Sequence, residues 1–320
     1  MLRFSKSSLL MPRPVSITIV SLRLLSIIAF LAGSLMTSPL FAADAIPPAR
    51  ELVLGKQVLI IAHRGNSSEF PENTIPAFES AVKVGSDLVE LDYYHSGDNQ
   101  PVVIHDNILD RTTDAEKILG EGKLLVAKTP LADLLKLDAG TWFDEKFSGT
   151  KIPTLTESID VIQSGSTTLI ERKAGDADTV VKVIQEKELM DRVVVQAFDW
   201  DYVSRCRELA PTLMLAALGG KTASPAQLKA AAKTGAQVIA WNHQEISKAQ
   251  IDQIHELGCK AWVYTVDDPK RALKLLEDGI DGIITNRPAT MLKLRAAYEA
   301  AQAKATGPKA TESTAAESAE

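Results

Sequence analysis

The sequence predicts a (β/α)8 barrel, or TIM barrel, with a small insertion after its second strand. Three observations support this prediction. Apolar runs of strand length alternate with amphipathic segments of helix length from Val58 onward, as in parallel sheets joined by right-handed crossovers. Eight such strands fall within about 230 residues, the size of this barrel. No glycine-rich dinucleotide turn follows the first strand, which disfavours a doubly wound open sheet.

The predicted strands are mostly apolar throughout, as strands buried on both faces are. They cover residues 58–62, 87–91, 168–171, 193–198, 213–218, 238–241, 261–266 and 282–285. Amphipathic segments with cap and stop residues predict the helices. These cover residues 74–84, 176–189, 201–209, 225–234, 247–257, 269–278 and 288–304.

Residues 93–166 form a connection too long for one crossover helix. Within it, we expect a hairpin strand at 101–105 and a helix at 131–137. Long connections of this kind are usually either functional or disordered. The aromatic content favours an ordered cap, so we interpret residues 106–153 as a small insertion over the barrel mouth.

Residues 1–42 have the layout of a secretory signal peptide. Positive residues and an apolar run at 24–32 precede the small residues Ala42 and Ala43, and no acid occurs before Asp44. A retained membrane anchor is the alternative, but the apolar run is short for a bilayer span. We therefore expect export, a periplasmic or secreted protein, and no stable membrane anchor after cleavage.

Removing the signal peptide takes away four positive charges and no acid, which changes the net charge from −6 to −10. A chain this acidic is a poor ligand for nucleic acid or anionic membranes. Residues 43–57 lead into the barrel at 58–300, and the polar tail at 301–320 is expected to be disordered. Cys206 and Cys259 are interpreted as two buried thiols, with a single disulfide bridge as the alternative.

Acidic side chains stand at the carboxyl ends of predicted strands, where the active sites of these barrels lie. Glu90 and Asp92 are two residues apart, so their side chains point the same way. Glu171 ends the next barrel strand. Three converging carboxylates would repel one another unless a hard divalent cation neutralised them. The alternative is three solvated loop acids, the usual state of a single glutamate.

Two histidines and two cations stand at the same strand ends. His63 and His105 are candidates for proton transfer, because imidazole titrates near neutral pH. Arg64 and Lys173 could neutralise a phosphate. Together with a cation site, these groups suit phosphoryl transfer at a phosphodiester.

The sequence resembles the glycerophosphodiester phosphodiesterase family over residues 58–295. The resemblance is carried by Ala62-His63-Arg64-Gly65, Pro71-Glu72-Asn73-Thr74, Glu90-Leu91-Asp92, Pro101-Val102-Val103-Ile104-His105-Asp106, Gln196-Ala197-Phe198-Asp199 and Gly282-Ile283-Ile284-Thr285-Asn286-Arg287-Pro288.

This resemblance implies a barrel with an inserted segment that cleaves glycerophosphodiesters to glycerol 3-phosphate and an alcohol. It also implies a divalent cation, Ca²⁺ or Mg²⁺, and a small-molecule substrate. The roles it implies are metal ligation by Glu90, Asp92 and Glu171, acid–base catalysis by His63 and His105, and phosphate binding by Arg64 and Lys173.

Two positions depart from the family pattern. Arg172 stands where a small apolar residue is frequent, and strand alternation turns it away from the mouth. Tyr264-Thr265-Val266-Asp267 replaces a more familiar Trp-Thr-Val-Asn. The alcohol pocket has aromatic candidates, each of which could equally pack in the core: Trp142, Phe143, Phe198, Trp241 and Tyr264.

Two other functions remain open. One is a phospholipase D-like lipid phosphodiesterase of the sphingomyelinase type, which would need an exposed apolar rim. The other is a non-catalytic barrel that only binds phosphodiesters. Such a barrel would be expected to lack a catalytic histidine or a metal-binding acid, and the sequence retains all of them.

Overall fold

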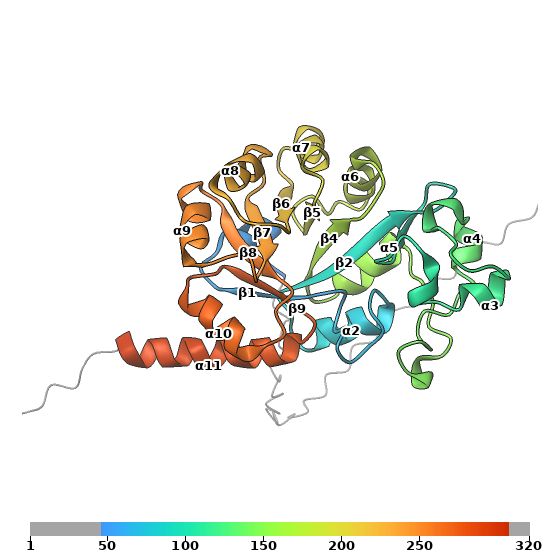
Figure 1. The fold of residues 1–320 in the computed structure, drawn as a ribbon, viewed down its shortest axis with the longest axis horizontal. Coiled ribbons are helices and arrows are strands. Elements are labelled where there is room, and N and C mark those ends of the chain that lie inside the picture. The colour runs from blue at the N-terminus through green and yellow to red at the C-terminus, as the bar shows by residue number, and fades with distance from the viewer. Residues whose placement is uncertain (1–45, 307–320) are drawn as a thin grey trace, which may run out of the picture. The chain divides into compact units, whose positions relative to one another are not determined.

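A closed barrel of eight parallel strands, surrounded by helices, forms the centre of the protein (Figure 1). The computed structural model describes residues 46–306. The strands follow the order β1-β9-β8-β7-β6-β5-β4-β2, and pairing of β1 with β2 closes the ring, which confirms the predicted barrel. The barrel strands are β1 (Leu59–Ala62), β2 (Leu88–His95), β4 (Thr167–Arg172), β5 (Val193–Ala197), β6 (Met214–Gly219), β7 (Val238–Asn242), β8 (Lys260–Tyr264) and β9 (Gly282–Thr285).

All the predicted crossover helices form within a few residues of their expected ends. They are α2 (Ile75–Lys83), α6 (Ala177–Glu186), α7 (Trp200–Leu209), α8 (Pro225–Lys233), α9 (Lys248–Glu256), α10 (Pro269–Glu277) and α11 (Pro288–Thr306). Outside the insertion, two further helices were not expected, α1 (Ala49–Leu54) and α5 (Leu155–Ile162). Helix α5 begins with a capping box, in which Thr154 Oγ1 accepts from the backbone N–H of Glu157 and Glu157 Oε2 accepts from that of Thr154.

Strand alternation divides the core into two layers. Leu59, Ile61, Leu88 and Leu169 belong to an inner cluster that includes α1 but none of the surrounding helices. The intervening strand residues pack outward against those helices in a second cluster. Because side chains of one strand alternate between the two sides, residues that follow Leu88 and Leu169 in steps of two also face the barrel interior.

The hairpin strand β3 (Pro101–Val103) pairs antiparallel with the end of β2 and leads into the predicted insertion at 106–153. The insertion extends beside β2 in Figure 1 and shares a small apolar core with Val102 and Ile104 of the hairpin segment. The hairpin strand and the helix are both shorter than predicted. The other elements of the insertion are η1 (Leu109–Arg111), α3 (Ala115–Leu119), η2 (Val126–Lys128), α4 (Leu131–Leu134) and η3 (Glu145–Phe147).

The two ends of the chain bear on several predictions. Helix α11 runs to Thr306, so the predicted disordered tail at 301–320 begins too early. The rest of the predicted tail, from residue 307, and the predicted signal peptide at 1–42 lie outside the described residues. Export therefore stays a prediction. Both cysteines are buried and free, which agrees with two thiols.

Of the helices in residues 46–306, none is both long enough and apolar enough to cross a membrane.

Candidate active site

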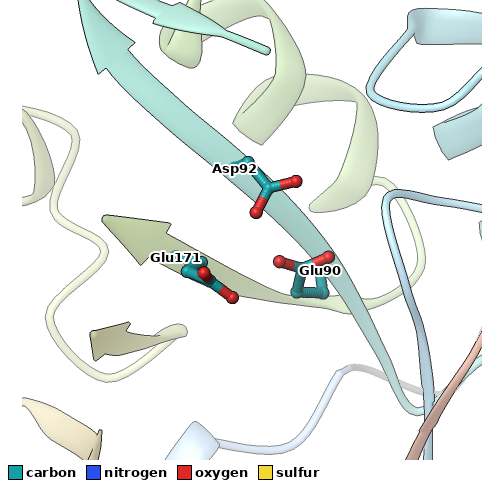
Figure 2. Close-up of side chains that lie close together, drawn as sticks. All are labelled: Glu90, Asp92 and Glu171. Carbon is teal, nitrogen blue, oxygen red and sulfur yellow. The ribbon is translucent and has the colours of Figure 1, made fainter. Parts of the chain in front are cut away.

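Three buried carboxylates meet at the carboxyl ends of β2 and β4 (Figure 2). One oxygen from each of Glu90, Asp92 and Glu171 lies within 4.8 Å of the others. The strands bring them together because Asp92 and Glu171 are direct neighbours in the parallel pairing. All three follow Leu88 or Leu169 in steps of two, so they share the interior face.

Two cations offset part of the negative charge. Arg64 Nε lies 3.2 Å from Asp92 Oδ2, and Lys173 Nζ lies 3.1 Å from Asp92 Oδ1. Lys173 also pairs with Glu171. Burial would raise the pKa of Asp92, but Lys173 and Arg64 outweigh burial and lower it.

The negative charges of the other two carboxylates, Glu90 and Glu171, are not fully balanced by these cations. Burial, followed by the charge of Asp92, raises the pKa of Glu90 well above its usual value and that of Glu171 to about 7. Glu90 Oε1 is buried and has no hydrogen-bond partner among the described residues, whereas Asp92 Oδ1 has only its ion pair with Lys173. Three carboxylates against two cations, with a buried oxygen of Glu90 left without a partner in the described part of the chain, fit a hard divalent cation that prefers oxygen ligands.

Side chains that were not predicted as site residues hold these carboxylates in place. Asn73 Nδ2 donates to Asp92 Oδ2 at 2.8 Å, and Asn73 Oδ1 accepts from the backbone N–H of Asp92. Gln196 Nε2 donates to Glu171 Oε2 at 3.1 Å, and the backbone N–H of Arg64 donates to Glu90 Oε2 at 2.7 Å. Asn73 and Gln196 stand in the motifs quoted above, but only the tertiary contacts show what they hold.

His63 is held by an amide of fixed orientation. Its Nδ1 lies 2.7 Å from Asn286 Oδ1, while Asn286 Nδ2 donates to Asp267 Oδ2 at 2.6 Å. Because the amide oxygen can only accept, His63 carries its proton on Nδ1 and leaves Nε2 free when neutral. Burial and the neighbouring charge of Arg64 lower the pKa of His63 to about 4, so it is neutral at pH 7.

His105 has a charged partner instead. Its Nδ1 lies 2.6 Å from Asp106 Oδ1. Burial lowers the pKa of His105, and the nearby carboxylates of Asp92 and Asp106 oppose that shift. An ionised partner stabilises an imidazolium more than an amide does. The two histidines therefore occupy different electrostatic environments.

A cavity of about 210 Å³ opens beside these groups. Its polar side includes both histidines and Glu171. Glu90 and Asp92 lie behind this lining, where they contact the lining residues Arg64 and Lys173. The opposite wall is apolar, and Phe198 meets Tyr264 edge to face with ring centroids 5.9 Å apart. The lining residues are His63, Arg64, His105, Glu171, Lys173, Gln196, Phe198, Leu218, Tyr264, Thr265 and Ile284.

Three of the five aromatic candidates for the pocket do not line this cavity, which corrects their predicted role. Trp241 follows the interior residue Ala240, so alternation turns it outward into the helix layer, where it is fully buried. Trp142 and Phe143 lie in the insertion and pack against each other with centroids 5.7 Å apart. Phe198 and Tyr264 remain as pocket residues.

Arg172 points away from the cavity, as alternation predicts. Its Nη1 donates to Asp199 Oδ2 at 2.8 Å, and Asp199 caps the first turn of α7. The departure from the family pattern at this position therefore leaves the cavity lining unchanged.

Residues 63–290 match the model of the glycerophosphoryl diester phosphodiesterase family. A glycerophosphodiester phosphodiesterase from Caldanaerobacter subterraneus subsp. tengcongensis is 34% identical over 245 residues, covering 74% of this chain and 98% of the relative. One from Bacillus subtilis is 30% identical over 288 residues, covering 83% and 94%.

Solved structures agree with the family match. An Oleispira antarctica phosphodiesterase in complex with the product sn-glycerol-3-phosphate has a TM-score of 0.68 and 28% identity, covering 77% of this chain and 98% of its own. A glycerophosphodiester phosphodiesterase from Agrobacterium tumefaciens has a TM-score of 0.63 and 27% identity, covering 75% and 100%.

Proposed function

Because the chain belongs to the glycerophosphoryl diester phosphodiesterase family, we propose that it hydrolyses glycerophosphodiesters to glycerol 3-phosphate and an alcohol. The observation that carries this proposal is a single cavity lined by two histidines, two cations and a carboxylate of the buried acidic cluster. The product bound to the Oleispira relative is of the same chemical class.

The phosphate would bind at the polar side of the cavity. Arg64 and Lys173 line it and carry positive charge, so they would neutralise the non-bridging oxygens of a phosphodiester. Glu90, Asp92 and Glu171 would hold a divalent cation, Ca²⁺ or Mg²⁺. When bound, this ion supplies positive charge that stabilises the phosphoryl oxygens as the transition state forms.

The two histidines would divide the proton transfers according to their partners. His63 Nε2, free and neutral, would accept the proton of the attacking hydroxyl as its oxygen bonds to phosphorus. This hydroxyl is either water or the substrate's own glycerol hydroxyl, and in the second case a cyclic phosphodiester forms that water then opens. His105 would act in its protonated form, which burial disfavours and Asp106 favours, and would give its Nε2 proton to the alkoxide as the bond from phosphorus to the alcohol breaks. Hydrolysis overall adds one water across that bond.

The proposal is tested by comparing glycerophosphocholine, glycerophosphoethanolamine and sphingomyelin as substrates, first with a chelator and then with Ca²⁺ or Mg²⁺ restored. We expect glycerol 3-phosphate from the glycerophosphodiesters, no product in chelator, and recovery with metal. Cleavage of sphingomyelin alone would favour the lipid-directed alternative. Failure to cleave any substrate with either ion would overturn the proposed activity.

The apolar wall of the cavity predicts a role for Phe198 in binding the alcohol group. Phe198 is 49% exposed and lines the cavity together with Tyr264. Phe198→Ala should weaken substrate binding by about 1 kcal/mol, or about fivefold in KM, with a smaller change in kcat. Leu273→Ala is the control, because Leu273 is also exposed but lies on α10. An unchanged KM for Phe198→Ala would show that the wall does not contact substrate.

A further inference from the structure

Arg111, at the end of η1 in the insertion, bridges two carboxylates beside the cavity. Its Nη1 and Nη2 donate to the two oxygens of Glu72 at 3.0 and 2.7 Å. Its Nε donates to Asp106 Oδ2 at 2.5 Å. All three nitrogens of the guanidinium are therefore engaged, in the forked geometry that arginine provides and lysine cannot.

Each of these carboxylates in turn contacts a residue that lines the cavity. Glu72 Oε1 accepts from Arg64 Nη1 at 2.8 Å, and Asp106 Oδ1 lies 2.6 Å from His105 Nδ1. Arg111 therefore contacts both Glu72, which holds the proposed phosphate-binding residue Arg64, and Asp106, which holds the proposed proton donor His105. It does not itself line the cavity.

Positive and negative side chains alternate in this network, and Arg111 supplies the positive charge between Glu72 and Asp106. Without it, Glu72 and Asp106 would each lose a hydrogen-bonded cation and be free to turn toward other donors. The Arg111 hydrogen bond is the largest influence that lowers the pKa of Asp106, to about 2. An ionised, immobile Asp106 accepts from His105 Nδ1 and so directs Nε2 of that ring away from Asp106.

Stability alone does not account for such a network. Arg111 is 44% exposed in its side chain, and exposed ion pairs contribute little to the free energy of unfolding. Its other contact is with the ring of Trp142, whose centroid lies 5.9 Å from the guanidinium carbon. Arg111 and Trp142 both belong to the insertion, so the guanidinium contacts the insertion as well as Glu72, which lies outside it.

We propose that Arg111 is a positioning residue through which the insertion orients His105, by way of Asp106, and Arg64, by way of Glu72. The proposal rests on the proposed function, because it assigns a purpose to the two residues held. It implies that the barrel residues alone do not complete the active site.

A double-mutant cycle tests the proposal. Arg111→Ala should lower kcat for glycerophosphocholine by about 10- to 100-fold, because small displacements of catalytic groups carry costs of that order. Arg111→Lys should retain an intermediate rate. Asp106→Ala should also lower kcat, and the double variant should lose less than the product of the two single losses, since both act through one contact.

The control is Arg205→Ala on α7. Arg205 is similarly exposed and also bridges two acids, Asp178 and Glu208, so it should show a similar change in Tm with wild-type kcat. If Arg111→Ala keeps kcat within twofold of wild type, or if the two single losses multiply fully in the double variant, Arg111 does not position His105.

A second measurement separates this proposal from the proposed function. The ¹⁵N chemical shifts of the His105 ring, assigned by their loss in His105→Ala, report its tautomer whether or not the protein cleaves any substrate. We expect an Nδ1-protonated ring in the wild type and a tautomer mixture in Arg111→Ala. The same tautomer in both proteins would overturn the positioning role, whereas a wild type without turnover would overturn only the proposed function.

Discussion

Asp92→Asn is expected to abolish both divalent-cation binding and phosphodiester cleavage. Asp92 is fully buried, and it is the carboxylate that contacts both Arg64 and Lys173. The amide keeps the shape of the side chain but removes its charge, so the cation and the two basic residues lose their common anion. The expected loss in kcat is at least about 10³-fold, because metal-assisted charge stabilisation contributes several kcal/mol.

Calorimetric titration with Ca²⁺ and Mg²⁺, beside steady-state cleavage of glycerophosphocholine, measures both losses. Asp281→Asn is the matched control. Asp281 also contacts two basic residues, Lys260 and His255, but it lies just before β9, at the opposite end of the barrel. That variant should lose stability and still bind the cation. If Asp92→Asn binds either ion with wild-type affinity, the acidic cluster is not the metal site.

His63→Ala and His105→Ala should each lower kcat for glycerophosphocholine by about 10²- to 10⁴-fold, the range of general acid–base catalysis. The two variants should differ with an activated leaving group. A p-nitrophenyl ester of glycerol phosphate expels a phenolate that needs no proton. It should therefore restore much of the rate of His105→Ala and little of the rate of His63→Ala.

His255→Ala provides the control for loss of a histidine, because this side chain pairs with Asp281 away from the cavity. Its kcat should match the wild type with either substrate. Rescue of His63→Ala instead of His105→Ala would exchange the two roles. Equal activity of all three variants would leave the family fold without acid–base catalysis by histidine.

Local sequence patterns predicted the barrel because its elements depend on local chemistry. Each barrel strand is a short apolar run with a turn or a cap on either side, and these patterns can be recognised without knowledge of the tertiary contacts. The same patterns failed for α5. Its capping box at Thr154 and Glu157 was visible, but the long insertion before it hid where the barrel resumed.

Strand alternation also predicted the acidic cluster. The steps of two from Glu90 to Asp92, and the place of Glu171 at the end of the next barrel strand, were sufficient to expect convergence. The same reasoning could not place Trp241. Its strand is apolar on both faces, so the sequence carries no contrast to show which side faces the interior.

By itself, then, the sequence determined the barrel, the strand ends that carry chemistry and the family to which that chemistry belongs. The tertiary structure alone decided which side chains hold the proposed catalytic groups. Asn286 reaches His63 across 223 positions of sequence, and Arg111 reaches Glu72 across 39. The physical reason is that periodicity specifies which face a residue occupies, whereas such contacts depend on how distant loops meet once the barrel has closed.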